Sequence, residues 1–238
     1  MPEFPPPDAV HHDATQSSYL ILKYAHDTAE SLLEAFSSIR SARNARGTPT
    51  DEEQDLLRAM VVFAGAGIDS MTKQLIRDAL PVMATTLPAA RARMEQLGAR
   101  HLQRAGPLDI GQDDSGNLLG VNPQRLAKVL FAETPRAGML ELLVSDLTAG
   151  SLQSASELYR VLSYLGVDKN SIGATETELR EVFDCRNSLI HEMDIDFSQP
   201  NRNRFPRPKG NMVKYAKTLL SASKAILKSI DDQLMTAQ

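Results

Sequence analysis

The sequence predicts an all-α protein, and three observations support this class. The 238 residues are 42% hydrophobic and 24% charged, a balance that allows a buried core. Aromatic residues make up only 5% and tryptophan is absent, while alanine and leucine are frequent, which favours helices over strands. Apolar residues recur at helical spacing in long segments, and no segment shows a convincing strand pattern. We therefore expect a helical bundle that forms one domain over residues 17–238, after a disordered or extended tail over residues 1–16.

The N-terminal half predicts two long helices. The first is expected from near Ser17 to Arg46, where Gly47-Thr48-Pro49 stops it. The second begins at Thr50-Asp51-Glu52-Glu53, a capping box in which the Thr hydroxyl and the last Glu carboxylate satisfy free backbone donors. Pro81 is expected to kink or end this helix.

The segment Val62-Phe63-Ala64-Gly65-Ala66-Gly67-Ile68 in the second helix allows two interpretations. A glycine pair after an apolar run can form a phosphate-binding turn. We reject this interpretation because the run starts helically at a capping box and no third glycine follows. Small residues here instead favour the close approach of two helices, despite a propensity cost of about 1 kcal/mol per glycine.

The middle of the chain predicts shorter helices over 89–104, 123–133, 136–148 and 152–165, inserted into the bundle. The loop over 106–122 contains Asp109, Asp113 and Asp114 but lacks the ligand spacing and terminal Glu of an EF-hand, so we interpret it as a solvated loop. A second capping box, Thr175-Glu176-Thr177-Glu178, opens the penultimate helix. A basic, proline-containing loop over 198–210 precedes the last helix.

Composition excludes several classes of protein. The single cysteine, Cys185, excludes an intrachain disulfide framework and cysteine-rich zinc sites, and it fits a reducing compartment. No apolar run reaches the roughly 18 residues of a membrane span, and the N-terminus lacks the pattern of a signal peptide. We expect a cytoplasmic protein with no membrane association, no metal and no cofactor.

Charge is unevenly distributed along the chain. The net charge is −4, yet residues 197–230 contain no Asp or Glu and carry eight positive side chains, so the rest of the chain carries −12. A segment of one sign in an acidic protein is a candidate polyanion-binding surface. A solvated helix face after a basic loop is the alternative.

Arg186 and His191 are the candidate catalytic residues. Arg186 falls on the apolar stripe that Val182 and Ile190 define, where a fixed charge is costly unless it is paired or lies at a cleft or interface. The alternative is an arginine that reaches past the core edge or pairs with an acid such as Asp184. His191 lies five residues later, about 140° around the helix axis, so one helix would make a poor site. Two copies packed around a two-fold axis would bring both Arg–His sets into one cleft.

Arg186-Asn187-Ser188-Leu189-Ile190-His191 resembles the HEPN signature, an arginine and a polar residue followed by a histidine after four to six intervening residues. Its context is similar to the RiboL-PSP-like branch of that superfamily. The similar blocks are the sequence around the motif from Asp184 to Asp194, the basic stretch 201–208 with the final helix, and the second helix from Phe63 to Pro81. Residues 106–173 take no part in the resemblance.

The resemblance implies an all-α homodimer that cleaves RNA without metal at a composite Arg/His cleft. The ribose 2′-hydroxyl would attack the adjacent phosphorus and leave a 2′,3′-cyclic phosphate and a 5′-hydroxyl end. Histidine titrates near neutral pH and can transfer the protons. A guanidinium can hold the phosphate oxygens on which charge develops.

Other residues would assist. Asn187 would orient His191 or bind phosphate, and Phe205 would stack on an unpaired base or else anchor its loop to the bundle. Asp69 is a weaker candidate, either a carboxylate that supports the motif helix or an ordinary surface acid. Flanking phosphates would be held by Arg202, Arg204, Arg207 and Lys209.

The expected function is that of a ribonuclease acting as a toxin or defence effector, with RNA as substrate and an antitoxin or other regulatory protein as a further partner. The alternative is a non-catalytic HEPN module that dimerises and binds a nucleotide, an RNA or a partner protein. A third interpretation is a helical scaffold in which the motif is accidental.

Overall fold

The computed structural model describes residues 3–104, 129, 131 and 133–237. Within these residues the regular elements are helices, with one isolated β-bridge between Ile195 and Arg204, so the all-α prediction is confirmed. None of the helices described is both long and apolar enough to cross a bilayer. The helices are α1 (Asp13–Ala42), α2 (Asp51–Thr86), α3 (Pro88–Arg104), α5 (Pro135–Ala149), α6 (Ala155–Leu165), the 3₁₀-helix η1 (Lys169–Ile172), α7 (Glu176–His191) and α8 (Lys209–Thr236).

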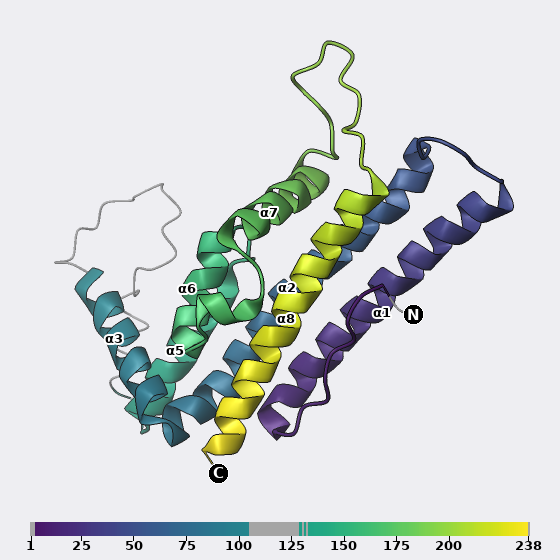
Figure 1. Ribbon diagram of the computed structural model, residues 1–238. Coiled ribbons are helices and arrows are strands. Elements are labelled where there is room, and N and C mark those ends of the chain that lie inside the picture. The colour runs from purple at the N-terminus through teal and green to yellow at the C-terminus, as the bar shows by residue number, and fades with distance from the viewer. Residues whose placement is uncertain (1–2, 105–128, 130, 132, 238) are drawn as a thin grey trace.

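Three long helices, α1, α2 and α8, lie side by side, while α5 and α7 pack against α2, and α6 packs against α3 and α7 (Figure 1). The helices share one core of buried residues, and α2 contributes to it along most of its length. The inserted helices α3, α5 and α6 separate α2 from α7 in sequence, as predicted. α7 packs against α2, α6 and α8, and the loop over 192–208 that follows it projects from one end of the bundle.

Local signals place most helix ends correctly. Both predicted capping boxes are present, and in the first the Glu53 N–H donates to the Thr50 hydroxyl at 3.3 Å while the Thr50 N–H donates to the Glu53 carboxylate at 2.9 Å. The prediction that Pro81 could end α2 was wrong, because the helix continues to Thr86. Burial of Leu80 and Met83 on either side of the proline outweighs the one backbone hydrogen bond that it removes. The predicted loop over 106–122 and most of the predicted helix over 123–133 lie outside the described residues.

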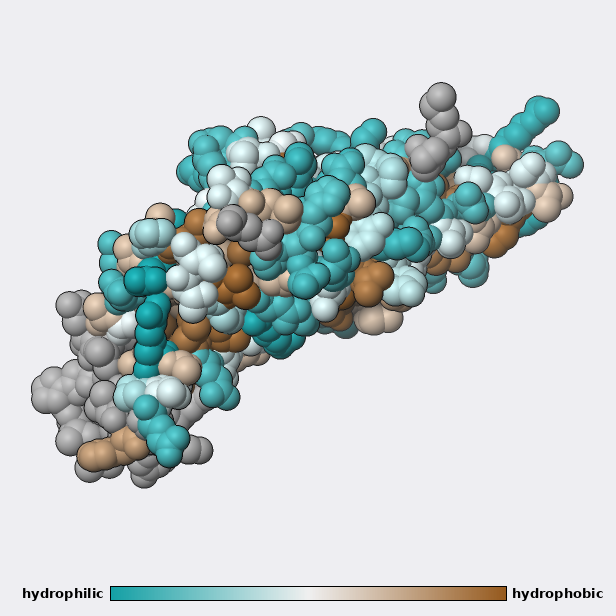
Figure 2. Space-filling view, turned by 90° about the horizontal axis from the view of Figure 1, so that it is seen from below, coloured by the Kyte–Doolittle hydropathy of each residue, from teal (hydrophilic) through white to brown (hydrophobic). Residues whose placement is uncertain are grey.

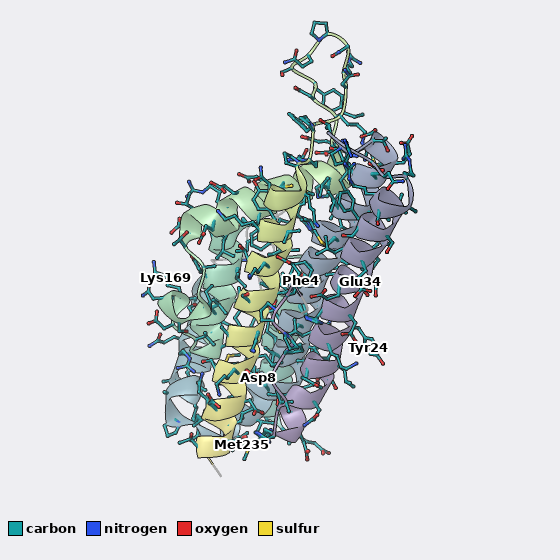
Figure 3. All side chains as sticks on the ribbon, turned by 45° about the vertical axis from the view of Figure 1, so that its right-hand side comes forward. Phe4, Asp8, Tyr24, Glu34, Lys169 and Met235 are labelled. Carbon is teal, nitrogen blue, oxygen red and sulfur yellow. The ribbon has the colours of Figure 1, made fainter. Side chains whose placement is uncertain are left out.

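Of the two states expected for residues 1–16, the described part of the N-terminal segment shows the extended one as far as residue 12, and it is docked on the bundle. α1 begins at Asp13, earlier than predicted. Phe4 is 1% exposed and lies against α1 (Figure 3), where its N–H donates to Glu30 at 2.7 Å. His26 Nε2 lies 3.3 Å from the Phe4 carbonyl oxygen. This docking had no sequence signal, since an extended segment has no helical period.

Asp231 on α8 anchors the other end of this segment. Its carboxylate accepts hydrogen bonds from the His12 N–H at 2.9 Å, the Thr15 hydroxyl at 2.7 Å and the His11 N–H. Burial favours a raised pKa for Asp231, but these hydrogen bonds outweigh burial and hold the pKa below its ordinary value of 3.8. Because the pKa is lower in the folded than in the unfolded chain, the stabilisation is complete above the unfolded value and is lost as pH falls through the folded one.

We expect Asp231→Asn to lower the free energy of unfolding by about 1–2 kcal/mol at neutral pH, since buried donors lose part of their acceptor. The difference from the native protein should shrink as pH falls below about 4. Urea denaturation at several pH values measures both effects. The matched control is Asp232→Asn, whose exposed carboxylate pairs with Lys228. A difference that stays constant down to about pH 3 would contradict the assignment.

Gly65 and Gly67 lie where other helices approach α2, which confirms the close-approach interpretation. A Cβ atom at Gly67 would lie 2.5 Å from the Ala25 Cβ on α1, and one at Gly65 would lie 3.1 Å from the Arg186 Cγ on α7. Both glycines are inside α2, so no phosphate-binding turn forms there.

Gly67→Ala is therefore expected to destabilise the protein by about 1–3 kcal/mol, because overpacking against α1 exceeds the gain in helix propensity. Gly98→Ala makes the same change in α3 where nothing lies within 4 Å of the new Cβ. That control should be stabilising by about 0.5–1 kcal/mol. Thermal unfolding compares the two variants, and a Gly67→Ala protein as stable as the native one would show that the contact is not tight.

Candidate functional site

α7 carries all three motif residues and ends directly after them. His191 is its last residue, and the Glu192 and Asp194 N–H groups both donate to the Ser188 carbonyl. Met193 and Asp194 then take φ values of 53° and 63°, which turn the chain sharply. The motif thus forms the C-terminal end of α7, and the position of His191 depends on the contacts that fix the bend at Met193 and Asp194.

Arg186 continues the apolar stripe of α7, as predicted, and is half-buried against Gly65 of α2. Its Nη1 donates to the Asn187 Oδ1 at 3.0 Å. Its Nε is buried and has no hydrogen-bond partner among the described residues. No ion pair joins Arg186 to Asp184 or to another acid in the described part of the chain, so the paired-arginine alternative is not what the structure shows. A half-buried guanidinium that no acid among these residues neutralises would be stabilised by an anionic ligand.

Asn187 is held from the other side by the segment that precedes α6. Its Nδ2 donates to the Gln153 carbonyl at 2.8 Å, while its Oδ1 accepts from Arg186. The two hydrogen bonds fix the amide orientation and so fix the direction of the Arg186 Nη1. This arrangement supports Asn187 as a residue that positions Arg186, a role different from the expected orientation of His191.

Asp69 supports this segment from α2. Its Oδ1 accepts from the Leu152 N–H at 2.8 Å, one residue before Gln153, and its Oδ2 accepts from the Lys73 Nζ at 2.8 Å. Asp69 is only 9% exposed, so the interpretation as an ordinary surface acid was wrong. Its carboxylate reaches the motif helix indirectly, through Gln153 and Asn187.

His191 is exposed, and no described residue forms a hydrogen bond with its ring. Arg186 faces α2, and five residues of helix rotate the chain by about 140° to His191. One chain therefore brings Arg186 and Asn187 together and leaves His191 on another side of α7.

A buried ion-pair cluster holds the bend after α7. Asp194 is 0% exposed, and its Oδ2 accepts from the Arg58 Nε at 2.8 Å and from the Arg207 Nε at 2.9 Å. The Arg58 Nη1 also contacts Asp51 and Asp55, each at 2.9 Å. The sequence analysis did not predict this cluster. The available signal was an arginine, Arg58, among apolar positions of α2, which is the kind of signal that identified Arg186.

The cluster keeps its two arginines charged. Burial lowers the pKa of both Arg58 and Arg207, but hydrogen bonds to Asp194, joined at Arg58 by those to Asp51 and Asp55, outweigh burial and raise the pKa overall. Burial also raises the pKa of the neighbouring Cys185 thiol to about 11. Cys185 is therefore protonated at neutral pH and is not a candidate nucleophile.

Two of the four predicted phosphate-binding residues are already paired within the protein. Arg207 binds Asp194, and the Arg204 Nη1 lies 2.7 Å from the Asp55 Oδ1 while its Nε donates to the Met193 carbonyl. This corrects the expectation that all four hold phosphates, because these two guanidinium groups anchor the loop instead.

The other two basic residues, Arg202 and Lys209, are exposed. The Lys209 Nζ lies 5.7 Å from the centroid of the buried Phe36 ring, and Arg202 takes a φ of 49° at the tip of the loop. Phe205 is half-buried, and its N–H donates to the Asp194 carbonyl at 2.8 Å. These contacts favour the anchoring role of Phe205 over base stacking.

Within the described residues, no group of three or more His, Cys, Asp or Glu side chains is placed to hold a metal ion. The geometry thus gives one half-buried, oriented cation, an exposed histidine and two exposed basic residues on the adjoining loop and helix. Comparison of the chain with protein-family models, with curated proteins and with solved structures finds no match to any of them.

Proposed function

We propose that this protein is a metal-independent endoribonuclease that acts as a homodimer with a composite Arg/His cleft. The observation that carries the proposal is the state of Arg186. Its guanidinium is half-buried, oriented by Asn187 and without an acidic partner among the described residues, a state that suits the binding of a phosphate. The resemblance of the Arg186–His191 segment to the HEPN signature adds the reaction type.

The proposed reaction uses these groups as follows. The ribose 2′-hydroxyl loses its proton and attacks the neighbouring phosphorus, and the bond from phosphorus to the 5′-oxygen breaks as that oxygen gains a proton. His191 transfers these protons, and Arg186 stabilises the charge that develops on the non-bridging oxygens. The products are a 2′,3′-cyclic phosphate and a 5′-hydroxyl end, and DNA is not a substrate because it lacks the 2′-hydroxyl.

Exposed apolar side chains near the site support the dimer. Ile190 on α7 is 39% exposed, and Met193 after α7 is 64% exposed. Ile190 lies one turn after Arg186, and Met193 follows the end of the same helix. A two-fold axis beside these residues would bury them and add the second Arg–His set to the cleft.

The test is incubation of the purified protein with end-labelled RNA in EDTA, with the product ends identified. Cleavage to a cyclic phosphate is expected. Mixing Arg186→Ala with His191→Ala protein should restore part of the native activity, because the cleft of a mixed dimer keeps one arginine and one histidine, each from a different protomer. A strictly monomeric mass at micromolar concentration would contradict the composite cleft.

The second candidate is a non-catalytic HEPN module that binds a nucleotide, an RNA or a partner protein. The exposed His191, which has no positioning partner among the described residues, favours it. RNA binding without cleavage by the native dimer would support this alternative. For the active enzyme we propose a toxin-like or defence role in the cytoplasm, restrained by an antitoxin or other regulatory protein.

Neutralising Arg202 and Lys209 together, by Arg202→Gln and Lys209→Gln, should weaken RNA binding and flatten its salt dependence. The slope of log affinity against log salt should fall by about 0.7 for each phosphate that the protein no longer neutralises. Filter binding at several salt concentrations measures the slope. Lys169→Gln removes an exposed lysine on η1, far from the loop (Figure 3), and should leave the slope unchanged. Equal effects in both proteins would assign the weaker binding to overall charge.

A further inference from the structure

A cavity of about 660 Å³ lies between the start of α3, η1 and the end of α8. It is at the end of the molecule opposite the 192–208 loop (Figure 1), and the view from below shows apolar residues exposed among hydrophilic ones (Figure 2). Leu87, Ala89 and Ala90 form part of an apolar wall, and Ser229 and Thr236 add hydroxyl groups from α8. The proposed RNA-cleaving site uses none of these residues.

Arg93 is the fixed cation of this cavity. Its Nε donates to the Tyr164 carbonyl in the last turn of α6 at 3.2 Å. Its guanidinium occupies the space that a side chain at Gly166 would need, since a Cβ there would collide with Nη2. Gly166 also takes a φ of 70°, so glycine suits this position for two reasons. The packing holds the guanidinium in one place at the cavity wall.

The charge of Arg93 has no acidic partner among the described residues, and burial lowers its pKa. The other charged side chains at the cavity, Lys228 and Asp232, pair with each other at 3.1 Å. The positive charge of Arg93 is therefore not neutralised by the other charged residues of the cavity. The carbonyl groups at the C-terminus of α6 offset it in part. A half-buried cation is stabilised when an anion replaces the water that it has lost.

We propose that this cavity binds a small organic anion, a carboxylate or sulfonate attached to an apolar body. The anionic group would accept hydrogen bonds from the Arg93 Nη atoms, and the body would pack on Leu87, Ala89 and Ala90. The volume lies within the usual range of small-molecule sites, about 300–1,000 Å³. An inorganic anion would leave the apolar wall exposed, and a neutral apolar ligand would leave the guanidinium unpaired. The site is independent of RNA cleavage.

Anilinonaphthalene sulfonate is a suitable probe, because it joins a sulfonate to an aromatic body and fluoresces when its surroundings are apolar. We expect saturable binding to the full-length native protein and a loss of affinity of about tenfold or more in Arg93→Gln. Arg91→Gln is the matched control, since Arg91 lies on the same helix and also donates to backbone carbonyls, those of Ala84 and Thr85. It lines a neighbouring cavity, so the affinity should not change.

Two further measurements keep the test independent of folding. Arg93→Lys keeps the charge and should bind the probe more tightly than Arg93→Gln, with circular dichroism showing equal helix content in both. The neutral probe phenylnaphthylamine should bind about tenfold more weakly than the sulfonate, and octanoate should displace the sulfonate. Equal sulfonate affinity in native and Arg93→Gln proteins, a loss in Arg91→Gln alone, or equal affinity for the neutral probe would each overturn the proposal.

Discussion

Arg186→Ala is expected to lower the rate of metal-independent RNA cleavage by about 10²–10³-fold, because a preorganised cation stabilises charge that appears only in the transition state. His191→Ala should lower it by about 10²–10⁴-fold through the loss of proton transfer. Single-turnover cleavage of labelled RNA in EDTA measures the chemical step, and a separate titration measures binding. Since Arg186 also contacts substrate phosphate in this proposal, its removal should weaken binding as well, while that of His191 should affect mainly the rate.

Two companion variants separate charge from structure. Arg186→Lys keeps a cation but loses the planar fork that holds two oxygens, so its rate should stay well below native. Arg180→Ala removes an arginine from the same helix whose side chain is 68% exposed and pairs with Glu176 at the surface, and it should be neutral in rate and stability. Cleavage that requires added divalent metal, or that persists in Arg186→Ala and His191→Ala, would exclude the proposed mechanism.

The sequence was sufficient for the fold class because the signals of helices are local. A capping box satisfies its own backbone donors, so Thr50 and Thr175 mark the starts of α2 and α7 whatever surrounds them. The close approach at Gly65 and Gly67 followed from a similar local argument. The ends of α1 and the docking of Phe4 were missed, since they depend on contacts with other segments that no short pattern records.

Only part of the candidate site could be predicted from the sequence, because the rest depends on contacts between distant segments. Charge counting treats Arg202 and Arg207 alike, yet one is exposed and the other is bound to a buried carboxylate. The partners Arg58 and Asp194 are 136 residues apart, so their pairing leaves no trace in either local sequence. Arg186 could be identified because an arginine on an apolar stripe is unusual in itself. The structure was needed to show that Asn187 orients Arg186. It was also needed to show that the segment held by Asp69 supports Asn187.

Asp194→Asn is expected to lower the free energy of unfolding by about 3–5 kcal/mol, because two arginines would remain beside the site of the removed carboxylate. Equilibrium denaturation in urea measures the change. Asp196→Asn is the matched control in the same loop, since within the described part of the chain the Asp196 carboxylate accepts hydrogen bonds from the Ser198 N–H and hydroxyl alone. A decrease of similar size in both variants would mean that the cluster is not the source of stability.

This substitution also tests whether the cluster serves the motif. Asp194 fixes the bend directly after His191, and the same carboxylate holds Arg58 of α2 and Arg207 of the basic loop. If the bend positions His191, Asp194→Asn should slow cleavage even at temperatures where the variant is fully folded. Adding Arg207→Met to Asp194→Asn removes the arginine whose carboxylate partner is lost, while Arg58 keeps its contacts with Asp51 and Asp55, and should recover part of the stability. The rate of RNA cleavage should not recover in parallel. The stability depends on the buried charge that remains, whereas the cleavage rate depends on where the bend places the last turn of α7. A double variant that regains stability and cleavage in parallel would show that the cluster acts on the site through folding alone.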